Sequence, residues 1–218
     1  MSVATPGRDC PLCPRLSAFR QEWRAREPQW HNAPVPTFGD LDARLLVVGL
    51  APGLRGANRT GRPFTGDYAG DLLYQTLIDF GFASGTYTAS PDDGLALCGA
   101  TITNAVRCVP PENKPTPQEI KSCRPFLSAT IAAMPRLAAI LALGRIAHDS
   151  VVAALELKRS AVPFSHGASH AIQAGLTFFD SYHCSRYNTN TGVLTREMFR
   201  AVFERIRVTV DQAAPAVR

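Results

Sequence analysis

Apolar runs alternate along the chain with segments that have the spacing of amphipathic helices. The apolar runs predict three buried strands and a weaker fourth one: Arg44–Leu50, Ala100–Val106, Leu137–Leu143 and Thr177–Ser181. The amphipathic segments predict five helices: Pro14–Arg26, Gly70–Phe80, Thr116–Ala133, Arg145–Leu155 and Thr195–Val208. Nearly continuous apolar strands covered by helices are typical of an α/β domain with a mostly parallel sheet.

The length and patterning of the chain predict one domain. Its 218 residues can enclose one sizeable core but are slightly too few for two. We expect a single domain over residues 1–218 with a flexible tail after about residue 208. No stretch approaches the roughly 20 apolar residues of a membrane span, and residues 1–9 lack the apolar segment of a secretory signal. We therefore expect a cytoplasmic protein without a membrane partner. We also expect it to be monomeric.

The net charge changes this picture slightly. Lys and Arg number 23 against 18 Asp and Glu, a formal charge of +5. A basic excess suits a partner rich in phosphate, because neutralised phosphates release counterions. Many soluble domains carry a similar excess, so charge alone leaves nucleic-acid binding open.

The cysteines indicate a metal or cluster site more strongly. Four of them could supply its ligands: Cys10, Cys13, Cys108 and Cys123. Four thiolates suit a structural zinc ion or an iron–sulfur cluster, and their spacing alone does not choose between these, or exclude four unrelated thiols. We expect Cys98 to be a small buried apolar residue and Cys184 to be a tolerated small residue near the candidate site.

Several long motifs lie where the predicted strands end, which is where ligands bind in parallel sheets. They are residues 49–53 and 56–67 after the first strand, residues 113–117 after the second, and residues 181–189 with 192–195 after the fourth. Together with the four cysteines, these motifs closely resemble those of family 5 uracil-DNA glycosylases over residues 10–207.

The resemblance implies a fold, a reaction and a cofactor. The fold is a three-layer α/β/α sandwich around a four-stranded parallel sheet. The reaction is hydrolysis of the N-glycosidic bond of uracil, and of other deaminated bases such as hypoxanthine, in double-stranded and also single-stranded damaged DNA, which leaves an abasic site. The cofactor is a structural 4Fe–4S cluster on Cys10, Cys13, Cys108 and Cys123. Leu50 stands where family 4 enzymes carry an acidic residue, and Cys184 and Tyr187 also depart from many relatives.

Two residues are the candidates for catalysis. Asp67 is the one carboxylate of the first motif, and by resemblance it polarises water or stabilises the cationic sugar. It also stands where aspartate caps a helix, while Asp71 is expected to be solvated. His183 can donate a hydrogen bond to the base oxygen that gains negative charge, although a histidine is often structural.

Four residues are candidates for the base pocket. Phe64 offers a ring on which an extruded base can stack, or it is a core residue. Asn113 can read the Watson–Crick edge of the base, or it serves a turn before Lys114–Pro115. The backbone N–H groups near Gly49 and Ala51 are further candidate donors.

Six basic or aromatic residues are candidates for DNA contact. Arg186 and Tyr187 are expected to enter the minor groove beside the flipped nucleotide. The others are expected to bind phosphates: Arg55, Arg59, Arg62 and Lys114. A solvated charged face is the alternative for each of these four, and His166 is a further candidate for a phosphate contact.

Two other functions remain open at this stage. A non-catalytic nucleic-acid-binding module would explain the charge and the cysteines, but not why Phe64, Asp67 and His183 share one crevice. A nucleoside hydrolase is the other candidate, but such enzymes use an Asp-rich metal loop that this sequence lacks.

Overall fold

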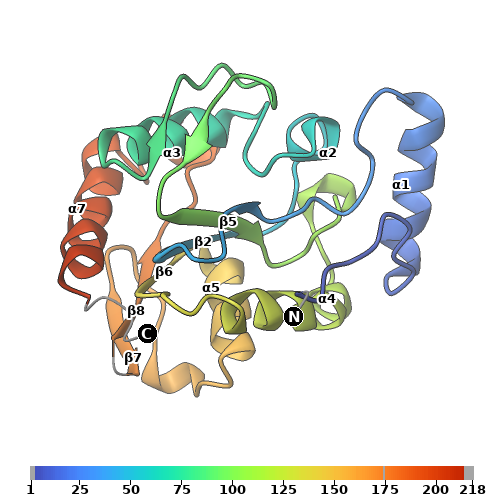
Figure 1. Ribbon diagram of the computed structural model, residues 1–218. Coiled ribbons are helices and arrows are strands. Elements are labelled where there is room, and N and C mark those ends of the chain that lie inside the picture. The colour runs from blue at the N-terminus through green and yellow to red at the C-terminus, as the bar shows by residue number, and fades with distance from the viewer. Residues whose placement is uncertain (1–2, 174, 214–218) are drawn as a thin grey trace.

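The computed structural model describes residues 3–173 and 175–213, which form a mixed sheet between two layers of helices (Figure 1). The sheet has the order β1-β5-β2-β6-β8-β7. Its strands are β1 (Phe38–Gly39), β2 (Leu45–Gly49), β5 (Ala100–Asn104), β6 (Ala139–Leu143), β7 (Ser169–Gln173) and β8 (Leu176–Ser181). A separate pair is β3 (Ala83–Ser84) with β4 (Ala96–Leu97).

The four predicted strands are the four central ones. Strands β5, β2, β6 and β8 pair in parallel, which confirms the predicted parallel sheet within a three-layer sandwich. The sequence did not predict β1 and β7, which add antiparallel edges. The structure ends β2 and β5 one and two residues earlier than predicted, before the loops that carry the motifs.

All five predicted helices are present, with ends that shift by up to four residues. The helices are α1 (Pro14–Arg26), α2 (Ala57–Thr60), α3 (Tyr68–Asp79), α4 (Pro117–Ala132), α5 (Arg145–Ala154), α6 (Arg186–Asn190) and α7 (Arg196–Gln212), with short 3₁₀ turns at Pro111–Asn113 and Arg159–Ala161. Thr116 and Glu119 form a capping box that starts α4. Helix α7 continues past residue 208 because Val210 packs into the core. The predicted start of the tail at 208 is therefore wrong, and residues 214–218 lie outside the described residues.

The strand residues alternate between two apolar cores, one on each face of the sheet. In β2, Leu45 and Val47 belong to the core under α3 and α7, whereas Leu46 and Val48 belong to the core under α4 and α5 (Figure 1). Burial on both faces explains why the central strands are apolar without interruption. Within the described ranges, none of the helices is long and apolar enough to cross a membrane.

Candidate active site

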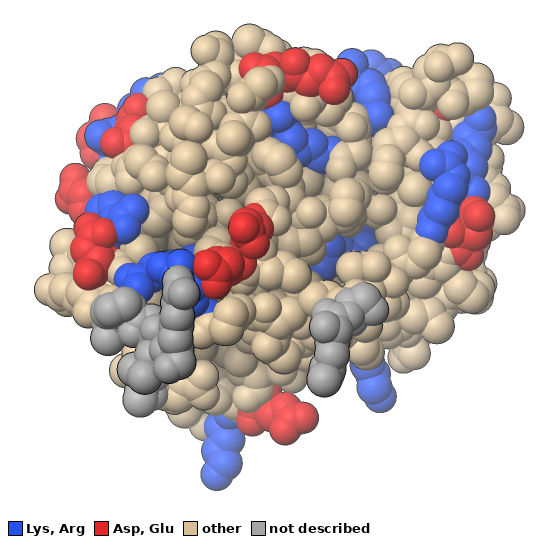
Figure 2. All heavy atoms as spheres, viewed as in Figure 1, with Lys and Arg blue, Asp and Glu red and all other residues tan. Residues whose placement is uncertain are grey.

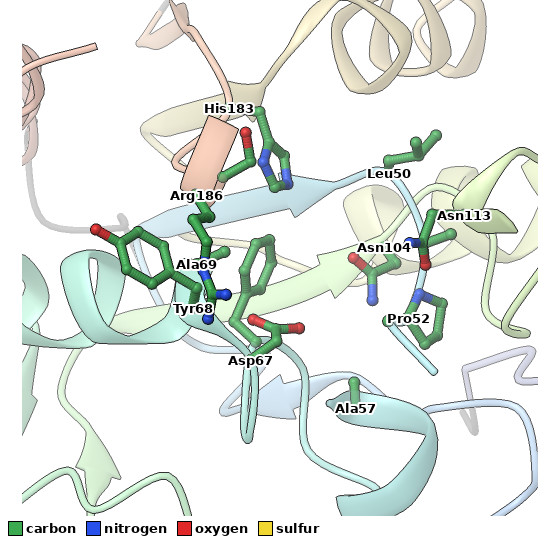
Figure 3. Close-up of a pocket in the computed structure, with 14 residues that line it drawn as sticks. Leu50, Pro52, Ala57, Asp67, Tyr68, Ala69, Asn104, Asn113, His183 and Arg186 are labelled. Carbon is green, nitrogen blue, oxygen red and sulfur yellow. The ribbon is translucent and has the colours of Figure 1, made fainter. Parts of the chain in front are cut away.

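A pocket of about 340 Å³ lies beyond the carboxyl ends of β2, β5 and β8. Its walls are residues 50–53, Ala57, Phe64, residues 67–69, Asn104, Asn113, His183, Ser185 and Arg186. Figure 3 shows how the polar side chains converge on one space from these separate loops. A volume of this size accommodates a small aromatic ligand such as a nucleobase.

Asp67 places an unpaired carboxylate at this pocket. Its backbone occupies the N-cap position of α3, but its side chain makes no capping hydrogen bond. Oδ1 is buried and has no hydrogen-bond partner within the described part of the chain. Burial raises the pKa of the Asp67 carboxyl above the ordinary 3.8, and the nearby backbone N–H groups of Gly70 and Ala69 oppose that rise. A carboxylate held in this way is available for chemistry rather than for capping.

The glycines of the first motif give Asp67 its space. A Cβ on Gly56 would lie 2.4 Å from Asp67 Oδ2, and one on Gly53 would lie 3.1 Å from the same atom. Gly49 lies beneath the pocket, where a Cβ would meet Asn104 Oδ1 and Phe64 Cζ at 2.5 Å each. The glycines are therefore explained by close approach of the backbone to site side chains. Gly49 is the last residue of β2 and does not line the pocket, and the donor role of its backbone N–H stays a prediction.

Phe64 forms one wall of the pocket with its ring near His183. The two ring centroids are 6.1 Å apart, with an interplanar angle of 30°. Phe64 adopts φ +53°, a left-handed conformation that costs a bulky residue about 1–3 kcal/mol. Surrounding contacts must therefore hold this conformation, which is a pattern found at functional sites.

His183 follows β8 and is half-buried at the pocket. Burial lowers the pKa of its imidazole below the ordinary 6.5, so the ring is neutral at physiological pH. Asn188 Nδ2 donates to the His183 carbonyl at 2.8 Å and ties it to α6. A neutral imidazole N–H is suited to donate a hydrogen bond to a developing oxyanion.

Asn104 is a pocket residue that the sequence analysis missed. It ends β5, pairs in register with Gly49 of β2, and is 3% exposed. Its amide points into the pocket beside that of Asn113 (Figure 3). An asparagine that ends an otherwise buried parallel strand was the available signal, because such ends face the ligand crevice.

The remaining predicted residues divide between the pocket and its surroundings. Ala51, Asn113 and Arg186 line the pocket, and the Arg186 guanidinium lies 5.2 Å from the ring centroid of Tyr68. The other predicted DNA contacts are exposed and lie outside its walls: Arg55, Arg59, Lys114 and Tyr187. Acidic and basic side chains are mixed over the face of the molecule shown in Figure 2.

Two expectations for individual residues need correction, those for Arg62 and Cys98. Arg62 is buried and ion-paired with Asp93, so its guanidinium is not free for the expected phosphate contact. Cys98 is exposed rather than buried, because it stands in the turn before β5. His166 accepts a hydrogen bond at Nδ1 from the Tyr182 backbone N–H at 3.1 Å, and its phosphate contact stays a prediction. Cys184 is a fully buried core residue, in line with its expected role as a small residue.

The four candidate ligand cysteines line one hollow between α1, α4 and the loop after β5: Cys10, Cys13, Cys108 and Cys123. None of these four cysteines forms a disulfide. No group of three or more His, Cys, Asp or Glu side chains within residues 3–173 and 175–213 meets the geometry of a single metal-ion site.

Two buried arginines accompany these thiols. Arg20 donates to Cys108 Sγ at 2.9 Å and to the Cys10 carbonyl, and Arg107 donates to the Val35 carbonyl and to Thr130 Oγ1. None of these acceptors is a carboxylate, so the two buried cations need another source of negative charge. Deprotonated thiolates of a cluster would supply it, and the hollow therefore fits an anionic sulfur-ligated group.

Comparison with known proteins agrees with this site. A model of the uracil DNA glycosylase superfamily matches residues 36–207. The type-5 uracil-DNA glycosylase of Thermus thermophilus is 48% identical over 199 residues, which cover 88% of this chain and 90% of that protein. The type-5 enzyme of Pyrobaculum aerophilum is 40% identical over 90% and 87% of the two chains, and the type-4 uracil-DNA glycosylase of Sulfurisphaera tokodaii is 30% identical over 81% and 76%. The chain therefore belongs to the uracil DNA glycosylase superfamily and, within it, is a DNA glycosylase of the type-5 uracil-DNA glycosylase family.

Proposed function

We propose that the pocket removes uracil and other deaminated bases, including hypoxanthine, from DNA and leaves abasic sites. The observation that carries this proposal is the unpaired Asp67 carboxylate beside the Phe64 ring and the neutral His183. A base must leave the duplex to reach such a pocket, at a cost of a few kcal/mol. Stacking on Phe64 would offset part of this cost, by about 1–3 kcal/mol.

The side chains divide the reaction between them. Asn104 and Asn113 present amides that can both donate and accept hydrogen bonds along the edge of the base. As the N-glycosidic bond breaks, its electrons pass to the base, and a His183 N–H stabilises the oxygen that becomes negative. Asp67, when ionised, faces the sugar, where it polarises the attacking water or stabilises the cationic carbon. Water adds its oxygen to that carbon, and its proton leaves to the carboxylate or to solvent.

The exposed residues around the pocket would bind the DNA strand. Arg55, Arg59 and Lys114 would bind phosphates, and Arg186 and Tyr187 would fill the space that the flipped nucleotide leaves. Tyr187 is 74% exposed, which suits insertion into DNA better than a role in packing. We propose that the protein acts as a monomer on duplex and single-stranded DNA.

The sulfur-lined hollow would hold a 4Fe–4S cluster on Cys10, Cys13, Cys108 and Cys123. When bound, the cluster would crosslink the segment before α1, helix α4 and the loop after β5, because its four ligands come from these segments. Protein purified without oxygen should be brown and contain about four irons per chain. Colourless protein with one zinc per chain would contradict this part of the proposal.

A panel of duplexes that each carry one lesion tests the proposed substrate range. We expect single-turnover release of both uracil and hypoxanthine, because amides and one imidazole can satisfy either base, whereas strict exclusion requires polar groups that the wrong base leaves unpaired. Release of uracil without hypoxanthine would refute the broad range. Tight DNA binding without release of any base would indicate a non-catalytic binding module instead.

A further inference from the structure

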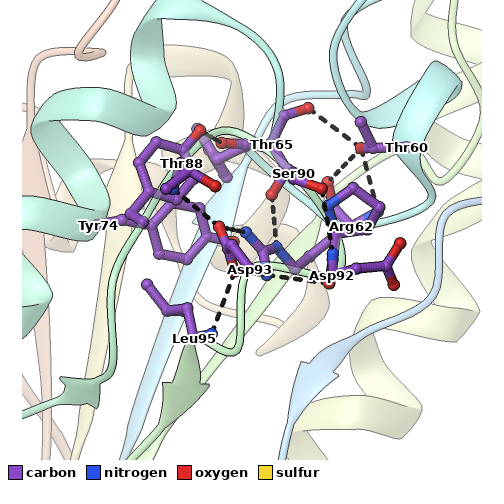
Figure 4. Close-up of polar contacts among 12 residues, drawn as sticks. Thr60, Arg62, Thr65, Tyr74, Thr88, Ser90, Asp92, Asp93 and Leu95 are labelled. Atoms are coloured by element: carbon purple, nitrogen blue, oxygen red, sulfur yellow. Dashed lines mark hydrogen bonds and ion pairs between the residues drawn. The ribbon is translucent and has the colours of Figure 1, made fainter.

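A buried ion pair joins the loop that carries Phe64 to the segment between β3 and β4. Arg62 Nη1 and Nη2 donate to Asp93 Oδ1 and Oδ2, both at 2.8 Å. The two side chains are 6% and 0% exposed. The catalytic steps proposed above do not use this pair (Figure 4), although Arg62 lies two residues before Phe64 and five before Asp67 in the chain.

The surroundings of this pair satisfy both charges. The Arg62 guanidinium lies 5.3–5.8 Å from three ring centroids, those of Phe38, Tyr74 and Tyr87. Asp93 also accepts from the Thr88 and Leu95 backbone N–H groups, at 3.0 and 3.1 Å. Because hydrogen bonds and rings enclose the pair, removal of one charge leaves the other buried and uncompensated.

The same residues hold the backbone on both sides of the Phe64 ring. Tyr74 and Tyr87, which both contact the guanidinium, donate their hydroxyls to the Pro63 and Phe64 carbonyls at 2.6 and 3.1 Å. Arg62 Nε donates to Thr65 Oγ1 at 2.7 Å. The left-handed conformation of Phe64 needs support of this kind, because a bulky residue rarely adopts it unaided.

We propose that the Arg62–Asp93 pair positions the Phe64 ring for stacking on the extruded base, so that Arg62 and Asp93 are positioning residues for excision. This inference rests on the proposed function of the pocket. The pair touches neither DNA nor base. It acts through the two tyrosines and Thr65, which fix the peptide units before and after Phe64.

The first test compares two neighbouring aspartates of the same loop. Asp93→Asn removes the charge that Arg62 binds, while Asp92→Asn makes the same change at an exposed side chain. We expect Asp93→Asn to lower single-turnover uracil excision at saturating enzyme by about 10-fold or more, because a small misplacement of a reacting group can cost about 100-fold in rate. Asp92→Asn should excise at the wild-type rate. Equal rates for all three proteins would overturn the proposal.

A double-mutant cycle separates positioning from simple stabilisation. If Asp93 acts through the Phe64 ring, Asp93→Asn should have an effect of about twofold or less in a Phe64→Ala background, because residues that act through one contact are non-additive. The same fold loss in both backgrounds would show that the pair acts elsewhere. All rates are measured well below the melting temperature of each variant.

A milder variant keeps the test decisive if Asp93→Asn fails to fold. Tyr87→Phe keeps the ring beside Arg62 and removes the hydroxyl that holds the Phe64 carbonyl. We expect it to slow excision several-fold, again without an additive effect on Phe64→Ala, and an unchanged rate would overturn the proposal. A wild-type protein that releases no base would refute the proposed function itself, which is a distinct outcome.

Discussion

Replacement of Asp67 by Asn tests the centre of the proposed chemistry. Asn keeps the shape of the side chain and can still serve as a helix cap, but it cannot carry the negative charge. The structure makes this change informative because the carboxylate makes no capping hydrogen bond and Oδ1 has no partner among the described residues. A loss of activity can therefore be attributed to the charge rather than to a broken structural contact.

The expected size of the loss follows from the two roles open to Asp67. General base assistance typically contributes about 10²–10⁴-fold, and removal of one electrostatic stabiliser costs about 10²–10³-fold. Single-turnover excision of uracil should therefore fall by about 100-fold or more, which corresponds to about 2.7 kcal/mol of transition-state stabilisation. Affinity for an abasic-site duplex should stay nearly unchanged, because the lost charge acts on the transition state.

Stability should change in the opposite direction. Burial raises the pKa of Asp67 above the ordinary 3.8, so the ionised carboxylate destabilises the folded state at neutral pH. This penalty shrinks as pH falls from the raised pKa and vanishes only below the ordinary pKa of an unfolded aspartate. Asp67→Asn should then melt at the same temperature as the wild type or higher. A variant with near-normal excision and a stability loss of about 1 kcal/mol would identify Asp67 as a helix cap and refute the reasoning.

Three further predictions concern the surroundings of Asp67 and the DNA. Gly56→Ala should slow single-turnover excision by about 10-fold or more, because the new Cβ would lie 2.4 Å from Asp67 Oδ2. The control is Gly7→Ala, which should excise at the wild-type rate because its Cβ meets nothing within 4 Å. The excision rate should rise with pH through one ionisation above 3.8 and show no inflection at 6.5, because burial raises the pKa of Asp67 and lowers that of His183. An inflection at 6.5 would mean that a histidine titrates in the rate-determining step. Arg186→Ala should lower the excision rate on duplex DNA about 5-fold more than on single strands, because only a duplex leaves a gap to fill. Equal losses on both substrates would indicate that Arg186 binds phosphates instead.

The sequence predicted the centre of the fold better than its edges. Strands β2, β5 and β6 are buried on both faces, so their apolar runs were strong signals. Strand β1 has two residues, and β7 is half-exposed and rich in polar residues. Neither carries a pattern that distinguishes it from a loop, and tertiary pairing alone creates them.

The sequence located the site mainly through motifs that end strands. Asp67, Phe64 and His183 do meet in one pocket, but Asn104 was taken as part of an apolar strand. Arg62 was misassigned because its partner, Asp93, lies 31 residues away in the chain. Tertiary packing decides which of several neighbouring arginines pairs with a buried carboxylate. The local sequence around each arginine does not encode that choice.

The structure of the protein bound to an abasic-site duplex and free uracil tests the central claim most directly. We predict that uracil stacks on Phe64, that its edge meets the amides of Asn104 and Asn113, and that a His183 nitrogen lies within hydrogen-bond distance of a uracil oxygen. The Asp67 carboxylate should face the anomeric carbon of the abasic sugar. Uracil bound elsewhere, or an abasic sugar turned away from Asp67, would contradict the assignment of this pocket as the active site.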